Sequence, residues 1–132
     1  MNITIDTSAL IAVLGNEASK PQIIEITKGC SLVAPASVHW EIGNAFSAMF
    51  KRRKLGIELA RQALMAYREI PIKFIDVPLE KALELSHAQN IYAYDAYFIQ
   101  CAQQTGTSLL TLDHGLKAAA ENAGVHTLEV GS

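Results

Sequence analysis

The amino-acid sequence predicts an α/β fold of three layers, with a central parallel sheet of four to five strands flanked by helices. Short β-branched segments alternate along the chain with longer segments whose apolar residues recur at helical spacing. Such alternation favours parallel strands joined by right-handed crossovers, which place helices on both faces of the sheet. Half of the 132 residues are hydrophobic and 18% are charged, as in a globular protein. The length fits one domain spanning residues 1–132.

The expected strands are short, and a residue that interrupts β structure follows several of them. Pro35 stops the second strand, and Asp76 with Pro78 closes the third. The expected strands cover Asn2–Ile5, Ser31–Ala34, Ile72–Ile75, Leu109–Leu112 and His126–Val130.

The helices are predicted from apolar spacing and from the glycines that separate or end them. The strongest signal covers residues 37–53, where apolar residues recur every three or four positions. Gly56 separates this helix from the next, and Gly106 stands where a left-handed cap ends a helix. The expected helices cover Ser8–Leu14, Pro21–Lys28, residues 37–53, Ile57–Ile70, Leu79–Gln89, Asp95–Thr105 and Leu116–Ala123.

The composition indicates where in the cell the protein is expected, but it does not indicate what the protein binds. The N-terminal segment lacks the basic leader of a signal peptide, and no apolar run approaches the roughly 20 residues that cross a bilayer. Cys30 and Cys101 lie far apart and outside any CxxC pattern, which indicates reduced thiols. We therefore expect a cytoplasmic protein with no membrane association. The net charge of −2 does not by itself indicate a nucleic-acid partner.

Four isolated acidic residues stand at the ends of apolar segments. Asp6 and Asp113 follow the first and fourth expected strands, and Asp95 opens a helix. Glu41 lies one turn inside the long helix, on the shoulder of its apolar stripe. Because ligands of open parallel sheets collect outside the carboxyl ends of the strands, we expect these four side chains to meet in one cleft.

Carboxylates gathered in a cleft are ligands for hard cations such as Mg²⁺ or Mn²⁺. One ion, or a pair roughly 3.5–4 Å apart, activates water and stabilises the leaving oxygen in phosphodiester hydrolysis. Without cations the clustered charges repel one another and raise one another's pKa. The four acids therefore predict a metal-dependent nuclease, with the number of ions left open.

Neighbouring polar residues are expected to hold these acids in place. Thr7 and Ser8 follow Asp6 and could cap the first helix or donate a hydrogen bond to a carboxylate. Asn44 lies three residues after Glu41 on the same side of its helix. Thr111 precedes Asp113 by two residues and so shares its strand face.

Each acid also has an ordinary structural interpretation. Asp6 and Asp95 could be helix N-caps, Asp113 a turn residue and Glu41 a solvated helix side chain. For any one residue this interpretation is the more common. The four together favour the metal site.

The four segments that carry these acids resemble the PIN-domain family, specifically the VapC group of toxin ribonucleases. The matching pieces are IDTSAL, WEIGNA, YDAYFIQCAQQTG and LLTLDHGL, in the family's order across nearly the whole chain. The resemblance implies an endoribonuclease that depends on Mg²⁺ or Mn²⁺, with Asp6, Glu41, Asp95 and Asp113 as its acidic quartet. It also implies a homodimer, and inhibition by a small antitoxin protein that covers the site.

Two other functions were weighed against a toxin ribonuclease. A PIN-fold enzyme of RNA maturation or quality control would have the same site. The short length of the chain favours the toxin over this alternative. A phosphorelay receiver domain has the same size and class but expects a pair of acids after the first strand and a lysine after the fifth. Here only Asp76 fits that pattern. The RNA cleaved and the antitoxin stay open.

Three further features have two interpretations each. The basic run Lys51–Lys54 suits either RNA phosphates or an acidic antitoxin segment, or complements the end of its helix. The tyrosines beside Asp95, at positions 92, 94 and 97, could stack on unpaired bases, although we favour packing. Trp40 falls on the far side of its helix from the apolar stripe, which suggests a protein interface.

Overall fold

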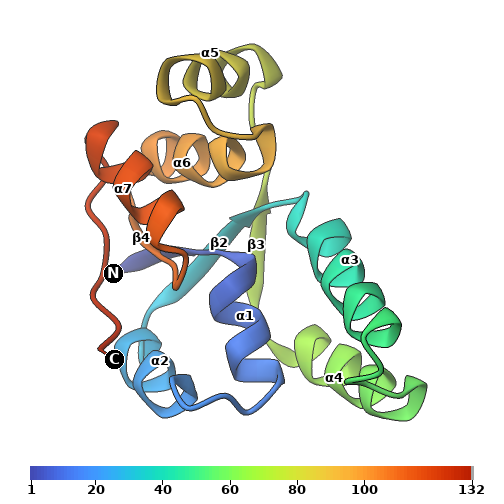
Figure 1. The fold of residues 1–132 in the computed structure, drawn as a ribbon. Coiled ribbons are helices and arrows are strands. Elements are labelled where there is room, and N and C mark those ends of the chain that lie inside the picture. The colour runs from blue at the N-terminus through green and yellow to red at the C-terminus, as the bar shows by residue number, and fades with distance from the viewer. Residues whose placement is uncertain (132) are drawn as a thin grey trace.

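A computed structural model describes residues 1–131 and contains a parallel sheet with strand order β3-β2-β1-β4 (Figure 1). The strands are β1 (Asn2–Ile5), β2 (Ser31–Pro35), β3 (Ile72–Ile75) and β4 (Ser108–Leu110). Thr4 of β1 pairs with Val33 of β2 on one side and with Leu109 of β4 on the other. The predicted α/β class and parallel sheet are confirmed.

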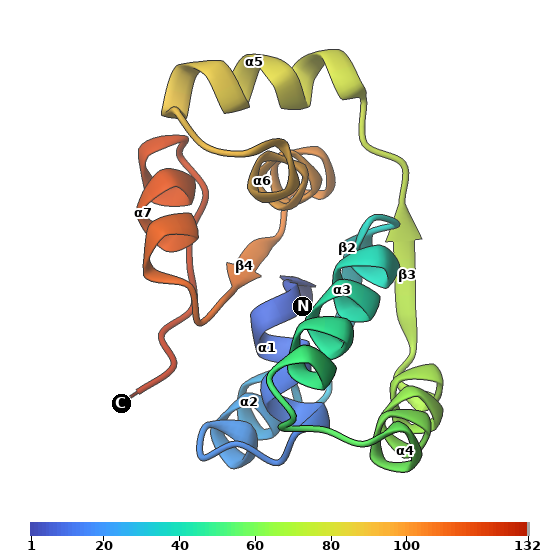
Figure 2. The ribbon, with the colours of Figure 1, turned by 45° about the vertical axis from the view of Figure 1, so that its right-hand side comes forward.

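Helices lie on both sides of the sheet, as expected. Figures 1 and 2 show α6 against the sheet with α5 outside it, while α1, α2 and α4 lie on the opposite side. The helices are α1 (Thr7–Leu14), α2 (Lys20–Thr27), α3 (Val38–Lys51), α4 (Ile57–Glu69), α5 (Leu79–Gln89), α6 (Ala93–Thr105) and α7 (His114–Asn122).

The hydrophobic core lies around the two central strands and α6. Ile3 and Ile5 of β1 are buried, and so is Thr4 between them, so the strand is covered on both faces. Phe98 and Ile99 of α6 are also fully buried. Burial of both faces is usual for a central parallel strand, and it fixes the end of β1, where Asp6 follows.

Helix and strand ends differ from the predicted ends by two residues at most. One difference matters for the site: α6 begins at Ala93, so Asp95 lies in its first turn and does not open it. Tyr92, in extended conformation, is the N-cap residue. Gly106 ends α6 in the left-handed region with φ of 65°, as predicted.

The predicted strand His126–Val130 is wrong. Within residues 1–131 this segment makes a single parallel bridge, between Thr127 and Leu109. The backbone N–H of Leu109 donates to the His126 carbonyl, and the N–H of Leu128 donates to the Leu109 carbonyl. Because β4 is only three residues long, it offers no further partner for a paired strand, and the described sheet has four strands.

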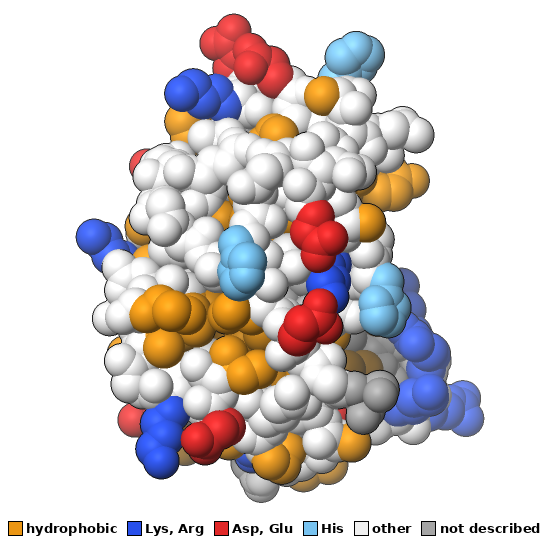
Figure 3. All heavy atoms as spheres, turned by 90° about the vertical axis from the view of Figure 1, so that its left-hand side faces the viewer, with side chains coloured by type: hydrophobic (Ala, Val, Ile, Leu, Met, Phe, Trp, Pro, Cys, Tyr) orange, Lys and Arg blue, Asp and Glu red, His pale blue; other side chains and the backbone are white. Residues whose placement is uncertain are grey.

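The surface is mixed in charge and the thiols are free. The face in Figure 3 carries interspersed acidic, basic and apolar side chains, in keeping with the small net charge. Cys30 and Cys101 form no disulfide, as expected. Among the described residues, no helix combines the length and apolar character that a membrane span requires.

Candidate metal-binding active site

All four predicted acids line one cleft of about 450 Å³ at the carboxyl edge of the sheet, which we call the acidic cleft. Asp6 follows β1, and Asp113 lies between β4 and α7. Glu41 stands in the first turn of α3 and Asp95 in the first turn of α6. The structure thus brings together residues that are up to 107 positions apart in the sequence.

Asp6 is the most buried and the most firmly held of the four. Its side chain is 3% exposed. The Ser8 hydroxyl donates to both carboxylate oxygens, at 2.7 and 3.0 Å, and the Thr111 hydroxyl donates to Oδ2 at 2.5 Å. The backbone N–H of Ala9 donates to Oδ1 at 3.0 Å, so Asp6 is also the N-cap of α1. The orientation of this carboxylate is therefore fixed from two strand ends.

The same two hydroxyls tie the segment after β4 to the segment after β1. Ser8 Oγ accepts from the backbone N–H of Leu112 at 2.9 Å, and Thr111 Oγ1 accepts from that of Asp113 at 3.0 Å. The expected roles of Ser8 and Thr111 as hydrogen-bond partners of an acid are confirmed. A shift of either strand end would move Asp6 and Asp113 together.

The structural interpretations of the acids are partly correct. Asp6 is a helix N-cap, as that interpretation had it, and Asp113 is an N-cap instead of a turn residue, since its Oδ1 accepts from the backbone N–H of Leu116 at 3.0 Å. This cap uses only one oxygen, so it is compatible with a ligand role. Asp95 is not an N-cap, because α6 begins before it. Glu41 is half-buried and is therefore not a solvated helix side chain.

Glu41 carries an unsatisfied oxygen inside the cleft. Among the described residues, Glu41 Oε2, Thr7 Oγ1 and Ser37 Oγ are buried side-chain atoms without a hydrogen-bond partner. The hydroxyls of Thr7 and Ser37 nevertheless lie close enough to the Glu41 carboxylate to lower its pKa, so Thr7 is beside an acid as expected, while the N-cap of α1 is Asp6. A buried polar atom without a partner costs about 1–3 kcal/mol. A cation in the acidic cleft would offset part of the cost of burying the Glu41 carboxylate.

Burial and mutual repulsion raise the pKa of three of the acids. Burial raises the pKa of Asp6 to about 6, with a further contribution from Asp113 against the lowering effect of its hydrogen-bond donors. Burial also raises the pKa of Glu41 to about 7, with contributions from Asp6 and Asp95, while the nearby hydroxyls of Thr7 and Ser37 act to lower it. The pKa of Asp95 is raised by burial and then by Asp113. Each acid thus repels two others, and the four form one electrostatic cluster.

The donors of the acidic cleft suit a hard divalent cation. Its lining supplies carboxylate and hydroxyl oxygens, and neither histidine nor cysteine takes part, which favours Mg²⁺ or Mn²⁺ over zinc. Within residues 1–131, no three acidic, histidine or cysteine side chains are close enough to chelate an ion as they stand. Mg²⁺ commonly binds through one or two carboxylates and keeps several waters. The residues therefore fit an ion that retains part of its hydration shell.

Sequence reasoning missed two residues of the site. Glu17 lines the acidic cleft as a fifth acid, but it lies in a polar turn after α1 where an acid is unremarkable. Ser37 precedes Glu41 by one helical turn. It occupies the N-cap position of α3 without making a capping bond. In the sequence, the position of Ser37 one helical turn before Glu41 is the feature that could have indicated its place beside the acid.

The remaining predictions have mixed outcomes. Asn44 lies on the same side of α3 as Glu41, since both line a second hollow beside the cleft. Trp40 is 75% exposed, as its position on the helix predicts. Packing is the wrong interpretation for Tyr92 and Tyr94, which are 86% and 53% exposed, because they precede the part of α6 that faces the core. Asp76 follows the edge strand β3, outside the acidic cleft, as expected.

Comparisons with known proteins agree with the fold. VapC ribonuclease Mb0985 of Mycobacterium bovis is 29% identical over 113 residues, 84% of this chain and 85% of the relative. The solved structure of PAE2754 from Pyrobaculum aerophilum is similar with a TM-score of 0.71 at 22% identity, over 90% of this chain and 79% of that one. A structure of VapBC2 from Rickettsia felis bound to a DNA fragment from their promoter has a TM-score of 0.67 at 14% identity, over 97% and 98%. Residues 3–122 match the model of the PIN domain, and the chain belongs to the PIN domain family.

Proposed function

We propose that the protein is an endoribonuclease that hydrolyses RNA phosphodiester bonds at the acidic cleft with Mg²⁺ or Mn²⁺, as the toxin of a toxin–antitoxin pair. The observation that carries the proposal is the convergence of Asp6, Glu41, Asp95 and Asp113 on one cleft at the carboxyl edge of the sheet. Membership of the PIN domain family and a relative named VapC ribonuclease support it.

The residues of the cleft would divide the chemistry among them. A bound ion would supply a water activated for attack and a counter-charge for the phosphate. Asp6 offers a carboxylate whose direction is fixed by Ser8 and Thr111. Glu41, with a pKa raised to about 7, is protonated in about half of the molecules at neutral pH and would lose that proton on meeting a cation. Asp95 and Asp113 would add further negative charge to the same cleft.

The proposal is tested by incubating the purified protein with single-stranded RNA. We expect cleavage with Mg²⁺ or Mn²⁺, none in EDTA, and recovery when excess Mn²⁺ is added back. An Asp95→Asn variant purified in the same way controls for contaminating ribonucleases, and it should be inactive. Cleavage that survives EDTA, or that the variant retains, would remove the assignment.

Thr111→Val is expected to weaken cleavage because Asp6 loses a donor that joins it to the end of β4. Loss of a group that orients a metal ligand typically costs about 10–100-fold in activity or metal affinity. The matched control is Thr107→Val, since Thr107 bonds Thr4 at 2.7 Å away from the cleft. Both variants should lose about 1 kcal/mol of stability, and only Thr111→Val should lose activity. Equal activity in the two variants would show that the hydroxyl does not position Asp6.

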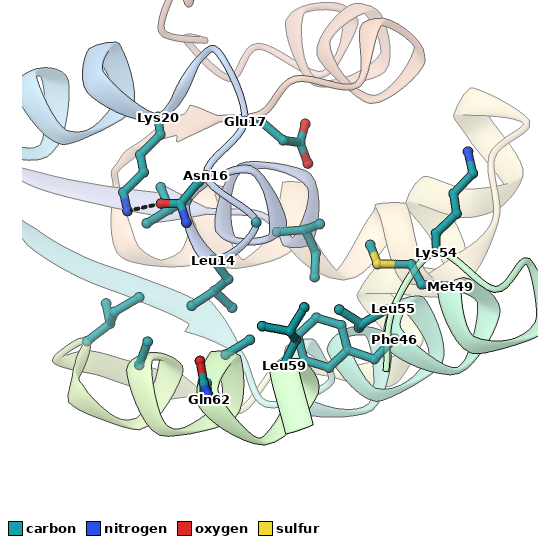
Figure 4. Close-up of a pocket in the computed structure, with 16 residues that line it drawn as sticks. Leu14, Asn16, Glu17, Lys20, Phe46, Met49, Lys54, Leu55, Leu59 and Gln62 are labelled. Carbon is teal, nitrogen blue, oxygen red and sulfur yellow. Dashed lines mark hydrogen bonds between the residues drawn. The ribbon is translucent and has the colours of Figure 1, made fainter. Parts of the chain in front are cut away.

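A partner site is offered by an apolar groove of about 640 Å³ between α1, α3 and α4 (Figure 4). Apolar side chains that include Leu14, Phe46 and Leu59 gather in it, with Lys20 and Lys54 at its rim. The groove adjoins the acidic cleft, because Ile11 and Glu17 line both. We propose that an apolar segment of an antitoxin with acidic flanks lies here and covers the entrance to the cleft. We also propose that the protein forms a homodimer.

Leu59→Glu should abolish antitoxin binding, because it places a charge in the apolar groove. Leu59 is 59% exposed, so the variant should fold. Met65→Glu is the control, since Met65 is on the same helix, is 65% exposed and does not line the groove. Calorimetry with the product of a small overlapping upstream reading frame measures binding. Equal binding by both variants would place the partner elsewhere, and absence of such a frame would favour the RNA-maturation enzyme.

A further inference from the structure

A second hollow of about 510 Å³ opens beside the acidic cleft, and we call it the aromatic hollow. Two aromatic rings, Trp40 from α3 and Tyr94 from α6, form part of its wall. The hollow and the cleft are continuous, because Thr7, Glu41 and Ala45 line both. The lining residues are Thr7, Trp40, Glu41, Asn44, Ala45 and Tyr94.

The two rings are exposed, and each has one aromatic neighbour. Trp40 is 75% and Tyr94 is 53% exposed. The ring of Trp40 contacts His39 edge to face, with centroids 6.4 Å apart. Tyr94 meets Tyr97 in the same manner at 5.8 Å. Because Trp and Tyr side chains have only two χ angles, an exposed ring loses little conformational entropy when a planar ligand stacks on it.

We propose that the aromatic hollow binds one unpaired nucleobase of the RNA strand whose phosphate enters the acidic cleft. This inference rests on the proposed function and adds to it a subsite for one base, formed by residues of α3 and α6. The base would stack on Trp40 and Tyr94, and the exposed amide of Asn44 would contact its polar edge. A base stacked within a duplex cannot enter, so paired RNA is excluded at this position.

The lining favours a nucleobase over an apolar protein surface. Thr7, Glu41 and Asn44 supply polar side chains to the wall, and Asn44 is exposed. An apolar protein surface packed here would cover the Glu41 carboxylate and the Asn44 amide without giving them polar partners, which is costly. The groove between α1, α3 and α4 differs, since aliphatic side chains predominate there. Continuity with the cleft places the base within the same strand as the reacting phosphate.

The test combines protein variants with missing bases in the RNA. After the cleavage site of a short unstructured RNA has been mapped, abasic nucleotides are placed in turn at each position near that site. Wild-type protein should lose kcat/KM at one position by about 5- to 150-fold, the range for stacking of one base on an aromatic side chain. Trp40→Leu should lose a similar factor on the intact RNA and be insensitive to the abasic nucleotide at that position. Tyr94→Leu should behave in the same way. Trp40→Phe keeps an aromatic ring and should remain sensitive to the abasic nucleotide at that position.

The matched control is Tyr92→Leu, because Tyr92 is 86% exposed at the start of α6 and does not line the aromatic hollow. It should keep wild-type activity and full sensitivity to the abasic nucleotide. Additive losses in Trp40→Leu, with no position where the base becomes irrelevant, would overturn the proposal. If Trp40→Leu changes the oligomeric state in sedimentation and leaves RNA cleavage unchanged, the proposal is also overturned, and Trp40 belongs to a protein interface. If wild type cleaves no RNA, the proposed function itself fails.

Discussion

Asp6→Asn is expected to abolish RNA cleavage while leaving the fold intact. Asp6 is the acid whose direction is most tightly fixed, by Ser8, Thr111 and the N–H of Ala9. An asparagine keeps the size and the cap acceptor but removes the negative charge that would hold the ion. Removing a preorganised electrostatic contact commonly costs about 10²–10³-fold in kcat, and loss of the ion itself would cost more.

The measurement is a cleavage assay over a range of Mn²⁺ concentrations, with circular dichroism to confirm folding. Asp76→Asn is the matched control, because Asp76 is an exposed acid at a strand end outside the cleft. It should cleave like wild type at every Mn²⁺ concentration. Full activity in Asp6→Asn would show that the charge at this position plays no part in hydrolysis.

The metal-free protein is expected to lose stability as pH rises from about 4 to about 7. Burial raises the pKa of Asp6 from 3.8 to about 6, so the folded state holds a proton that the unfolded state releases at lower pH. The free energy of unfolding therefore falls through this pH range. Asp6 contributes a fall of about 3 kcal/mol, because each pH unit between its two pKa values corresponds to about 1.36 kcal/mol. Glu41 adds to the fall in the same direction up to about pH 7, by less because it is half-buried.

A divalent cation should reverse this loss, because it binds the ionised carboxylates of the folded state. At about 100 times its dissociation constant the ion would stabilise the protein by about 2.7 kcal/mol. Urea denaturation at pH 5 and pH 8, in EDTA and in Mn²⁺, measures both effects. Asp6→Asn should be at least as stable as wild type in EDTA at pH 8 and should gain less from Mn²⁺. A metal-free protein that becomes more stable toward pH 8 would contradict the electrostatic description of the cleft.

The position of the site was predictable because two of its acids follow strands of one parallel sheet. Asp6 and Asp113 stand directly after segments with clear β patterns, and the carboxyl ends of β1 and β4 are neighbours. Glu41 was found from its angle to the apolar stripe of α3. These inferences need only periodicity and topology, which the local sequence determines.

The features that were missed depend on how separate elements pack. Tyr94 gives no local sign that it lies beside Trp40 of another helix, because their shared hollow exists only in the folded chain. Ser37 was overlooked for the same reason, since its unsatisfied hydroxyl follows from burial beside Glu41. The strand expected at His126–Val130 is reduced to one bridge because β4 is only three residues long, and the length of β4 is not evident from the local sequence.

Paramagnetic broadening by Mn²⁺ in amide NMR spectra tests most directly whether the four acids hold one ion site. At substoichiometric Mn²⁺, the amide signals of residues next to Asp6, Glu41, Asp95 and Asp113 should broaden first and together. They should remain sharp at the same Mn²⁺ concentration in Asp6→Asn. Broadening centred on another group of acids, such as Glu80 and Glu84 of α5, would contradict the account.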